Sequence, residues 1–485
     1  MTTIRFGSLG LIALLAGCSV GPDYQTPPSI AAPQQWNTPA TAKPKALNLT
    51  RWWARLGDPT LDKLIAEAVA GNLDVATAEA NVRAARASYL QAGGSLWPSL
   101  QGSGGFTRQR TAPAQGSGNS ATGNLYQAGF DAAWEIDLFG ANRRAAEAAG
   151  YGVDAAEENL RAALLTLIGD VATNYADARG YQKRIELARR IVDSQRETAD
   201  LTRAKFSVGT GSALDAARAD AEVASTEAQI PVLEAARAGA VHRLGILLGR
   251  EPGAVATEMA QSADLPTLTQ DPPREAPAEV LANRPDVRAA ERSLAQSTAQ
   301  IGVAEAARYP NISLTGSIAT YGAQFGDLGK HSTLGWSFGP SVTVPIFQGG
   351  ALQAAVELAQ AQRDQSFLAY RAAVLTALED VENASVGLNQ ERIRRERLTA
   401  QVTHSREAAR LARLLYDNGA SAFLDVLDAE RTLFAAEQSL LESEVAVVTD
   451  YVALAKALGG GWDQPVDSSQ PAVVDADMGP RFASP

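Results

Sequence analysis

The chain has 485 residues, a formal net charge of −11 and one cysteine. This mild acidity, without a long basic run, excludes nucleic acid as an expected partner, and a single cysteine excludes an intrachain disulfide. The chain carries neither a phosphate-binding loop nor an HExxH motif, so we expect no enzyme and no cofactor. The histidines are far apart in the sequence, so no metal site is predicted; they are His242, His331 and His404.

The amino terminus has the pattern of a secretory signal peptide. Arg5 precedes an apolar run over residues 6–15, and small residues follow before Cys18. The letters LAGC resemble the bacterial lipobox, and this resemblance implies cleavage before Cys18 and covalent lipid on it. Ser19 in the next position favours delivery to the outer membrane. No other apolar stretch is long enough for a membrane helix, so any crossing would be made by strands.

Helical and strand patterns then alternate along the first half of the chain. An extended arm over residues 18–57 is followed by a helical pattern from Asp58 to about Ala92. Alternating apolar and polar residues predict strands near 95–107 and 124–138. A long helical pattern covers residues 141–208, and a shorter one over 212–249 contains Pro231, which should kink it.

The second half of the chain repeats the first. The segment YDNGASAFLDVLDAE, from Tyr416, matches FSVGTGSALDAARAD, from Phe206, and Gly209 and Gly419 mark a hairpin tip in each copy. Other matches keep nearly the same spacing, so we infer a duplication. The predicted parts are a signal peptide (1–17), an arm (18–57), a first repeat (58–264), a linker (265–277), a second repeat with strands near 310–320 and 333–347 (278–461) and a disordered tail (462–485).

Four strands per chain require partner chains. About a dozen residues per strand suffice to cross an outer membrane, but lipid tolerates no open sheet edge, and four strands cannot close. Two chains would give a narrow eight-strand barrel, whereas three would give twelve strands and a wet lumen. The predicted fold is therefore mainly α with a transmembrane β part: a trimeric 12-strand β-barrel continued by a long α-helical coiled-coil barrel.

Several stretches resemble the outer-membrane factor family, the TolC-like exit ducts of tripartite efflux pumps, and its NodT-type lipoprotein branch. They are LAGC followed by GPDYQTPP, RWWARLGDPTLDKLIAEAVAGNLDV, QIPVLEAARAGAVHRLGILLG, RPDVRAAERSLAQSTAQIGVAEAARYPNISLTGS and LDVLDAE. The resemblance implies a lipid-anchored homotrimer in the outer membrane that extends into the periplasm and exports small molecules. It also implies docking on a periplasmic adaptor and an inner-membrane RND-type transporter. A type I protein-secretion duct and a structural coiled-coil lipoprotein remain the alternatives.

The resemblance also implies a periplasmic gate at the hairpin tips. Its ring carboxylates fall on Asp425 and Asp428. The family's closing link joins a tyrosine, an arginine and an aspartate of neighbouring hairpins. Its tyrosine falls on Tyr416 and its aspartate on Asp215, but its arginine position is Ser421, so the salt bridge of that link is missing. Six carboxylates in a narrow lumen would attract cations. The same aspartates favour helix N-termini and Tyr416 suits simple packing, so structural roles stay open for all of these residues.

Overall fold

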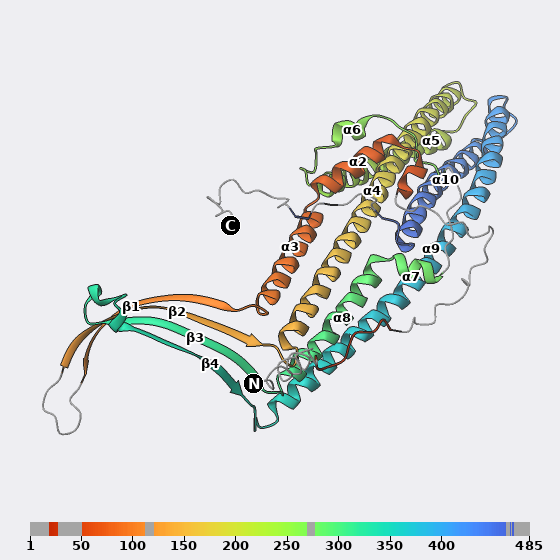
Figure 1. Cartoon of the computed structure of the whole chain (residues 1–485). Coiled ribbons are helices and arrows are strands. Elements are labelled where there is room, and N and C mark those ends of the chain that lie inside the picture. The colour runs from red at the N-terminus through yellow and green to blue at the C-terminus, as the bar shows by residue number, and fades with distance from the viewer. Residues whose placement is uncertain are drawn as a thin grey trace. The chain divides into compact units, whose positions relative to one another are not determined.

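The computed structural model describes residues 19–27, 51–111, 121–268, 277–461, 466, 468 and 469. The predicted signal peptide, Cys18 and most of the predicted tail lie outside these residues. The first half of the chain contains η1 (Trp52–Leu56), α2 (Pro59–Gly71), α3 (Leu73–Gly94), β1 (Ser99–Thr111), β2 (Ala121–Ile136), α4 (Ala141–Ser207), α5 (Ala213–Leu247) and α6 (Ala256–Ala260) (Figure 1).

The second half repeats this order of elements. It contains α7 (Pro277–Asn283), α8 (Pro285–Ala306), β3 (Asn311–Gly322), η2 (Phe325–Asp327), η3 (His331–Thr333), β4 (Leu334–Thr343), α9 (Ala351–Asp417) and α10 (Phe423–Ala457). Helices α4 and α9 both have 67 residues. Helices α5 and α10 both have 35, and α3 and α8 both have 22. The predicted duplication is therefore confirmed.

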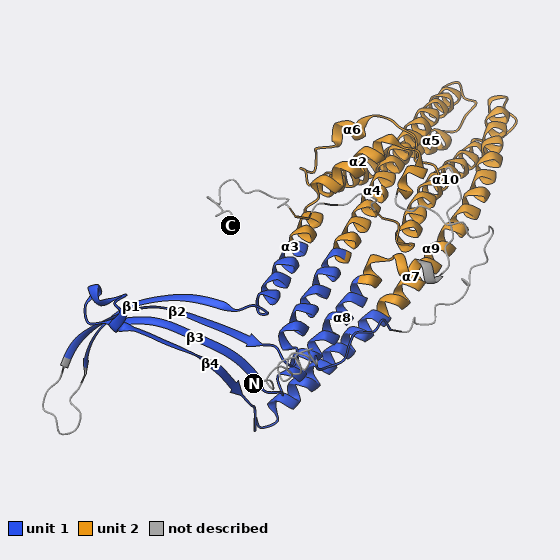
Figure 2. Ribbon diagram, in the orientation of Figure 1, with its two compact units in different colours: residues 1–28, 81–157, 289–371 blue, residues 29–80, 158–288, 372–485 orange. Residues whose placement is uncertain are grey.

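The chain divides into two compact units that do not coincide with its two repeats. Unit 1 holds residues 1–28, 81–157 and 289–371, and unit 2 holds residues 29–80, 158–288 and 372–485 (Figure 2). Each unit thus takes pieces from both repeats. In the described part of the chain, no helix combines the length and apolar character needed to cross a membrane.

One antiparallel sheet, ordered β1-β2-β3-β4, lies in unit 1. Residues directly opposite each other in neighbouring strands point to the same side of a sheet. The register pairs Phe130 with Ile318 and Ile318 with Trp336, whereas Asp131 pairs with Ser317 and Ser317 with Ser337. One face is therefore apolar and the other polar, as the alternation predicted. The apolar face is open: Leu100, Phe130, Trp336 and Phe338 are all more than half exposed.

A segment of β4 matches the GxSxG pattern of serine hydrolases. It covers residues 335–339, and the Ser337 hydroxyl lies 2.8 Å from the Ser317 hydroxyl across the strand pair. The hydrolase motif needs a sharp turn between a strand and a helix to present its serine. Here the serine lies inside a regular strand, so the pattern carries no catalytic meaning.

Two helices replace the single one predicted from Asp58 to about Ala92, so that prediction is wrong. Asn72 has an extended backbone, and its amide oxygen accepts hydrogen bonds from the N–H groups of Asp74 at 2.9 Å and Val75 at 3.0 Å. Its amide nitrogen donates to the Leu247 carbonyl at 2.9 Å. The helical spacing of apolar residues continues past position 72, so the pattern does not reveal that the Asn72 side chain ends one helix and caps the next.

The second repeat has its own break at the matching position. Arg284 lies between α7 and α8, and its guanidinium donates to the Ala457 carbonyl at 3.1 Å. The same side chain forms ion pairs with Asp286 at 2.6 Å and Asp380 at 3.0 Å. Asn72 in the first repeat and Arg284 in the second thus donate to the carbonyl of the last residue of α5 and of α10, respectively.

The core of unit 2 contains the tryptophan pair of the arm. Trp52 and Trp53 are almost fully buried, and the Tyr451 hydroxyl donates to the Trp52 carbonyl at 2.9 Å. The Tyr175 hydroxyl donates to the Asp58 carboxylate at 2.6 Å. These contacts join the start of the first repeat to α4 and α10.

Candidate functional site

Each of the two long helical hairpins, α4–α5 and α9–α10, reverses at a glycine. Gly209 and Gly419 have φ angles of +80° and +72°, which favour glycine. At the first turn Thr210 N–H donates to the Lys205 carbonyl at 2.9 Å, and at the second Ala420 N–H donates to the Leu415 carbonyl at 2.8 Å. These bonds close the last helical turn in both copies. The two glycines thus occupy the turns that the sequence predicted.

Two of the predicted gate carboxylates, Asp425 and Asp215, lie in the first turns of the outgoing helices, and Asp428 lies in the second turn of α10. The Asp425 carboxylate accepts a hydrogen bond from Ala422 N–H at 3.2 Å, and it is exposed, as is Asp428. Asp215 lies 3.7 Å from Arg218 within α5, and the Ser212 hydroxyl accepts from Leu214 N–H at 3.1 Å. Asp425 therefore stabilises its own helix start while keeping a free carboxylate edge.

Tyr416 packs inside unit 2 between the two hairpins. It is 8% exposed and belongs to a buried apolar cluster that includes Phe423 and Val426. Its hydroxyl lies 3.3 Å from the Thr202 hydroxyl on α4. In the described part of this single chain the structure does not pair Tyr416 with Asp215, so the link expected between neighbouring hairpins stays a prediction.

Lys205 completes the contact between the hairpins. Its ammonium donates to the Tyr416 carbonyl at 2.6 Å and lies 3.7 Å from the centroid of the Tyr416 ring. We call Thr202, Lys205 and Tyr416 the inter-hairpin tie. Sequence reasoning missed the lysine and the threonine because the tie joins helices 211 and 214 residues apart in the chain. A lysine in the last turn of α4 was the available signal, but it fits simple helix capping equally well.

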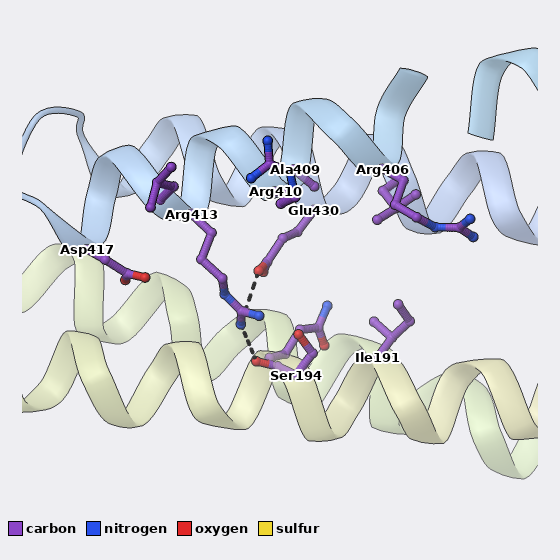
Figure 3. Close-up of a pocket in the computed structure, with 11 residues that line it drawn as sticks. Ile191, Ser194, Arg406, Ala409, Arg410, Arg413, Asp417 and Glu430 are labelled. Carbon is purple, nitrogen blue, oxygen red and sulfur yellow. Dashed lines mark hydrogen bonds and ion pairs between the residues drawn. The ribbon is translucent and has the colours of Figure 1, made fainter. Parts of the chain in front are cut away.

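A second polar connection lies farther along the same hairpins. The Arg413 guanidinium donates to the Ser194 carbonyl at 3.0 Å and lies 3.5 Å from the Glu430 carboxylate (Figure 3). It also donates to the Thr198 hydroxyl. Arg431 on α10 donates to the Glu222 carboxylate on α5 at 2.7 Å. Both ion pairs thus come from side chains that approach across helices rather than along one helix.

Burial raises the pKa of the Glu430 carboxyl, and the charge of Arg413 opposes that rise. The folded protein therefore binds a proton at Glu430 more readily than the unfolded chain does. Protonation of Glu430 therefore stabilises the folded protein. This contribution is complete below the ordinary glutamate pKa, and it is lost as the pH rises through the raised pKa of the folded protein.

A cavity of about 420 Å³ opens beside this connection, between α4, α9 and α10. Arg406, Arg410 and Gln195 contribute to its lining (Figure 3). Gln195 is 4% exposed, and its amide nitrogen and oxygen both lack a hydrogen-bond partner in the described part of the chain. The cavity therefore has the unsatisfied amide of Gln195 in its lining, whereas Arg406 is paired with Glu437 and Arg410 with Glu407. No group of three or more potential metal ligands occurs among the described residues.

Known proteins match the chain over most of its length. Residues 64–250 and 276–460 match the family model described as outer membrane efflux protein. Nodulation protein T of Rhizobium leguminosarum bv. trifolii is 36% identical, covering 93% of this chain and 96% of that protein. The toluene efflux pump outer membrane protein TtgI of Pseudomonas putida is 34% identical, covering 95% and 99%. The solved structure of the outer-membrane channel OprN superposes with a TM-score of 0.86 at 35% identity, covering 92% and 100%.

Proposed function

Because the chain belongs to the outer membrane efflux protein family, we propose that three copies of it form the exit duct through which a tripartite pump expels small molecules. The resemblance read from the sequence is confirmed by the family match and by the NodT relative. The protein lies in the outer membrane, as predicted, and functions in efflux.

The sheet is the observation that carries the proposal. Its apolar face is exposed along all four strands, and β1 and β4 are edges that pair with a single neighbour each. Strands β1, β2, β3 and β4 have 13, 16, 12 and 10 residues, which meets the length that a membrane strand needs. Open edges are not stable in lipid. Three chains would join edge to edge into a closed sheet of twelve strands, with the polar face lining a water-filled lumen.

The proposed gate consists of carboxylates near the hairpin tips. In a trimer, Asp425 and Asp428 would bring six carboxylates around the lumen, where their mutual repulsion favours bound cations. Ser421 stands at the position of the family's gate arginine, so the closing salt bridge would be missing. The inter-hairpin tie would then supply much of the resistance to opening.

Partners and the lipid anchor complete the proposal. The duct would dock on a periplasmic adaptor and receive substrate from an RND-type transporter in the inner membrane. The cavity lined by Gln195 and the Arg406 and Arg410 side chains offers the adaptor a polar contact near the tips. Cys18 would carry covalent lipid, while the duct itself would need no cofactor and no metal.

Single-channel conductance of the purified protein, with its native mass measured alongside, tests this function. We expect a trimer with small, flickering, cation-selective currents, because the gate rests closed and is lined by carboxylates. A matched sample carrying Asp425→Asn and Asp428→Asn should conduct with weaker cation selectivity. A monomer, or a trimer that never conducts even after tip substitution, would instead support a structural coiled-coil lipoprotein.

A further inference from the structure

The first described residues of the chain pack against the other segments of unit 1. We call residues 19–24 the N-terminal strap. Val20 N–H donates to the Phe139 carbonyl at 3.1 Å. Gly140, with a φ of +86°, lies so close to Ser19 that a Cβ built at position 140 would be 2.7 Å from the Ser19 hydroxyl oxygen. The strap therefore begins in a fitted contact just after strand β2.

Two glycines let the strap approach helix α8. A Cβ at Gly21 would lie 2.4 Å from the Cα atom of Gly302, and Gly21 also has a positive φ of +88°. A Cβ at Gly302 would lie 2.8 Å from the Cγ atom of Arg144. Both distances are far shorter than real carbon contacts. A side chain at Gly21 would force the strap away from α8, and a side chain at Gly302 would displace the Arg144 side chain that binds the strap.

Arg144 directs its buried guanidinium to the strap. The residue is 4% exposed, and it donates to the carbonyls of Val20 and Gly21, both at 3.4 Å, and to the Asp23 carboxylate at 2.5 Å. Its remaining ion pair is with Glu147 at 2.8 Å. A buried charge is stable only when it is paired and hydrogen-bonded, and here the strap supplies three of the acceptors.

Tyr24 fixes the far end of the strap. Its hydroxyl donates to the Glu291 carboxylate on α8 at 2.6 Å, and its ring contacts the Tyr151 ring edge-on, with centroids 5.8 Å apart. The strap is thus held at both ends and in the middle by the segment between β2 and α4 and by groups from α4 and α8. This density of specific contacts is unusual for a segment near a chain terminus, which is commonly loose.

Aromatic side chains lie where the helices adjoin the sheet, and we call Trp97, Trp134, Phe139 and Tyr309 the aromatic row. The Phe139 and Tyr309 rings stack with centroids 4.6 Å apart. Trp97 is 74% exposed, and the Trp134 indole N–H donates to the Leu96 carbonyl at 3.1 Å. Tryptophan and tyrosine concentrate at the interface between a membrane and water. These residues mark the helix-proximal end of the sheet as the level of the membrane surface.

We propose that the strap couples the lipid anchor to the sheet, with Arg144 as the positioning residue. By holding Ser19 at the aromatic row, the strap makes the lipid and the strands engage the same membrane leaflet at a fixed depth. The inference rests on the proposed function in two respects, the lipid on Cys18 and the sheet in the membrane. Cys18 itself is outside the described residues, but the sequence joins it to Ser19 by one peptide bond.

Hydrogen exchange tests the docking. In the full-length, acylated protein, the Val20 amide should exchange slowly, and Gly302→Ala should speed its exchange by about tenfold or more. Tyr24→Phe should give a smaller increase, since it removes one hydrogen bond. Gly239→Ala is the matched control, because it also adds a methyl group within a helix and nothing lies within 4 Å of it. Fast Val20 exchange in the unmodified protein would overturn the docking.

A double-mutant cycle tests the coupling. The melting temperature in liposomes is compared between acylated and Cys18→Ser proteins, in the unmodified, Gly302→Ala and Gly239→Ala backgrounds. We expect acylation to raise the melting temperature in the unmodified and Gly239→Ala backgrounds and to lose that increment in Gly302→Ala. An equal increment in all three, or none in the unmodified protein, would overturn the proposal. Conductance of the same samples reports the duct separately, so failure of the strap and failure of the duct are distinguished.

Discussion

Replacing Lys205 by methionine should loosen the tie between the two hairpins of one chain. The substitution keeps the aliphatic stem that packs near Tyr416 and removes the ammonium. The hydrogen bond to the Tyr416 carbonyl, at 2.6 Å, and the contact with its ring, at 3.7 Å, are both lost. The buried apolar cluster around Tyr416 stays in place, so the change acts on the tie and not on the core.

The expected magnitude follows from these two contacts. A hydrogen bond to a charged group contributes about 1.5 kcal/mol at the lower end of its range, and a partly exposed cation–π contact contributes about 0.5 kcal/mol. Lys205 is half-buried, so the lower values apply. The sum of about 2 kcal/mol corresponds to about a thirtyfold shift towards separated hairpins.

Open probability in planar bilayers measures that shift. Lys205→Met should lengthen and multiply openings, whereas Lys183→Met should leave them unchanged. Lys183 lies on the same helix and forms ion pairs with Glu186 at 3.3 Å and Asp264 at 3.1 Å, all within the first repeat. An unchanged open probability in Lys205→Met, with a normally assembled trimer, would show that the tie does not hold the gate.

Three further outcomes are expected. Asp425→Asn together with Asp428→Asn, which keeps the acceptor for Ala422 N–H, should weaken block by multivalent cations; unaltered block would remove these carboxylates from the lumen. The raised pKa of Glu430 should make the folded protein more stable as the pH falls, and Glu430→Gln should abolish this gain in thermal unfolding measured between about pH 4 and 8. Glu437 is the matched control, because its side chain is as little exposed as that of Glu430 and pairs with Arg406. Glu437→Gln should retain the gain. Cys18→Ser should abolish acylation, and lipid still detected by mass spectrometry would refute the lipobox assignment.

The repeat and the strands could be predicted because each depends on neighbours in sequence. Alternation of apolar and polar residues is a local property, and the register of the sheet then places Phe130, Ile318 and Trp336 on one face. The glycines at the two tips were visible because a left-handed turn demands that residue. Helix breaks were harder, since the asparagine at position 72 caps through a side chain that also fits a helix interior.

The amino-acid sequence by itself determined the duplication, the membrane-competent strands, the hairpin turns and the family. Tertiary structure alone decided which side chains meet across elements far apart in the chain. Lys205 reaches Tyr416, Arg413 reaches Thr198, and Arg144 closes over the strap. Such contacts depend on how helices and the strap are placed against one another. Periodicity fixes which face of a helix is apolar, but it does not fix which polar residue at the edge of that face finds a partner.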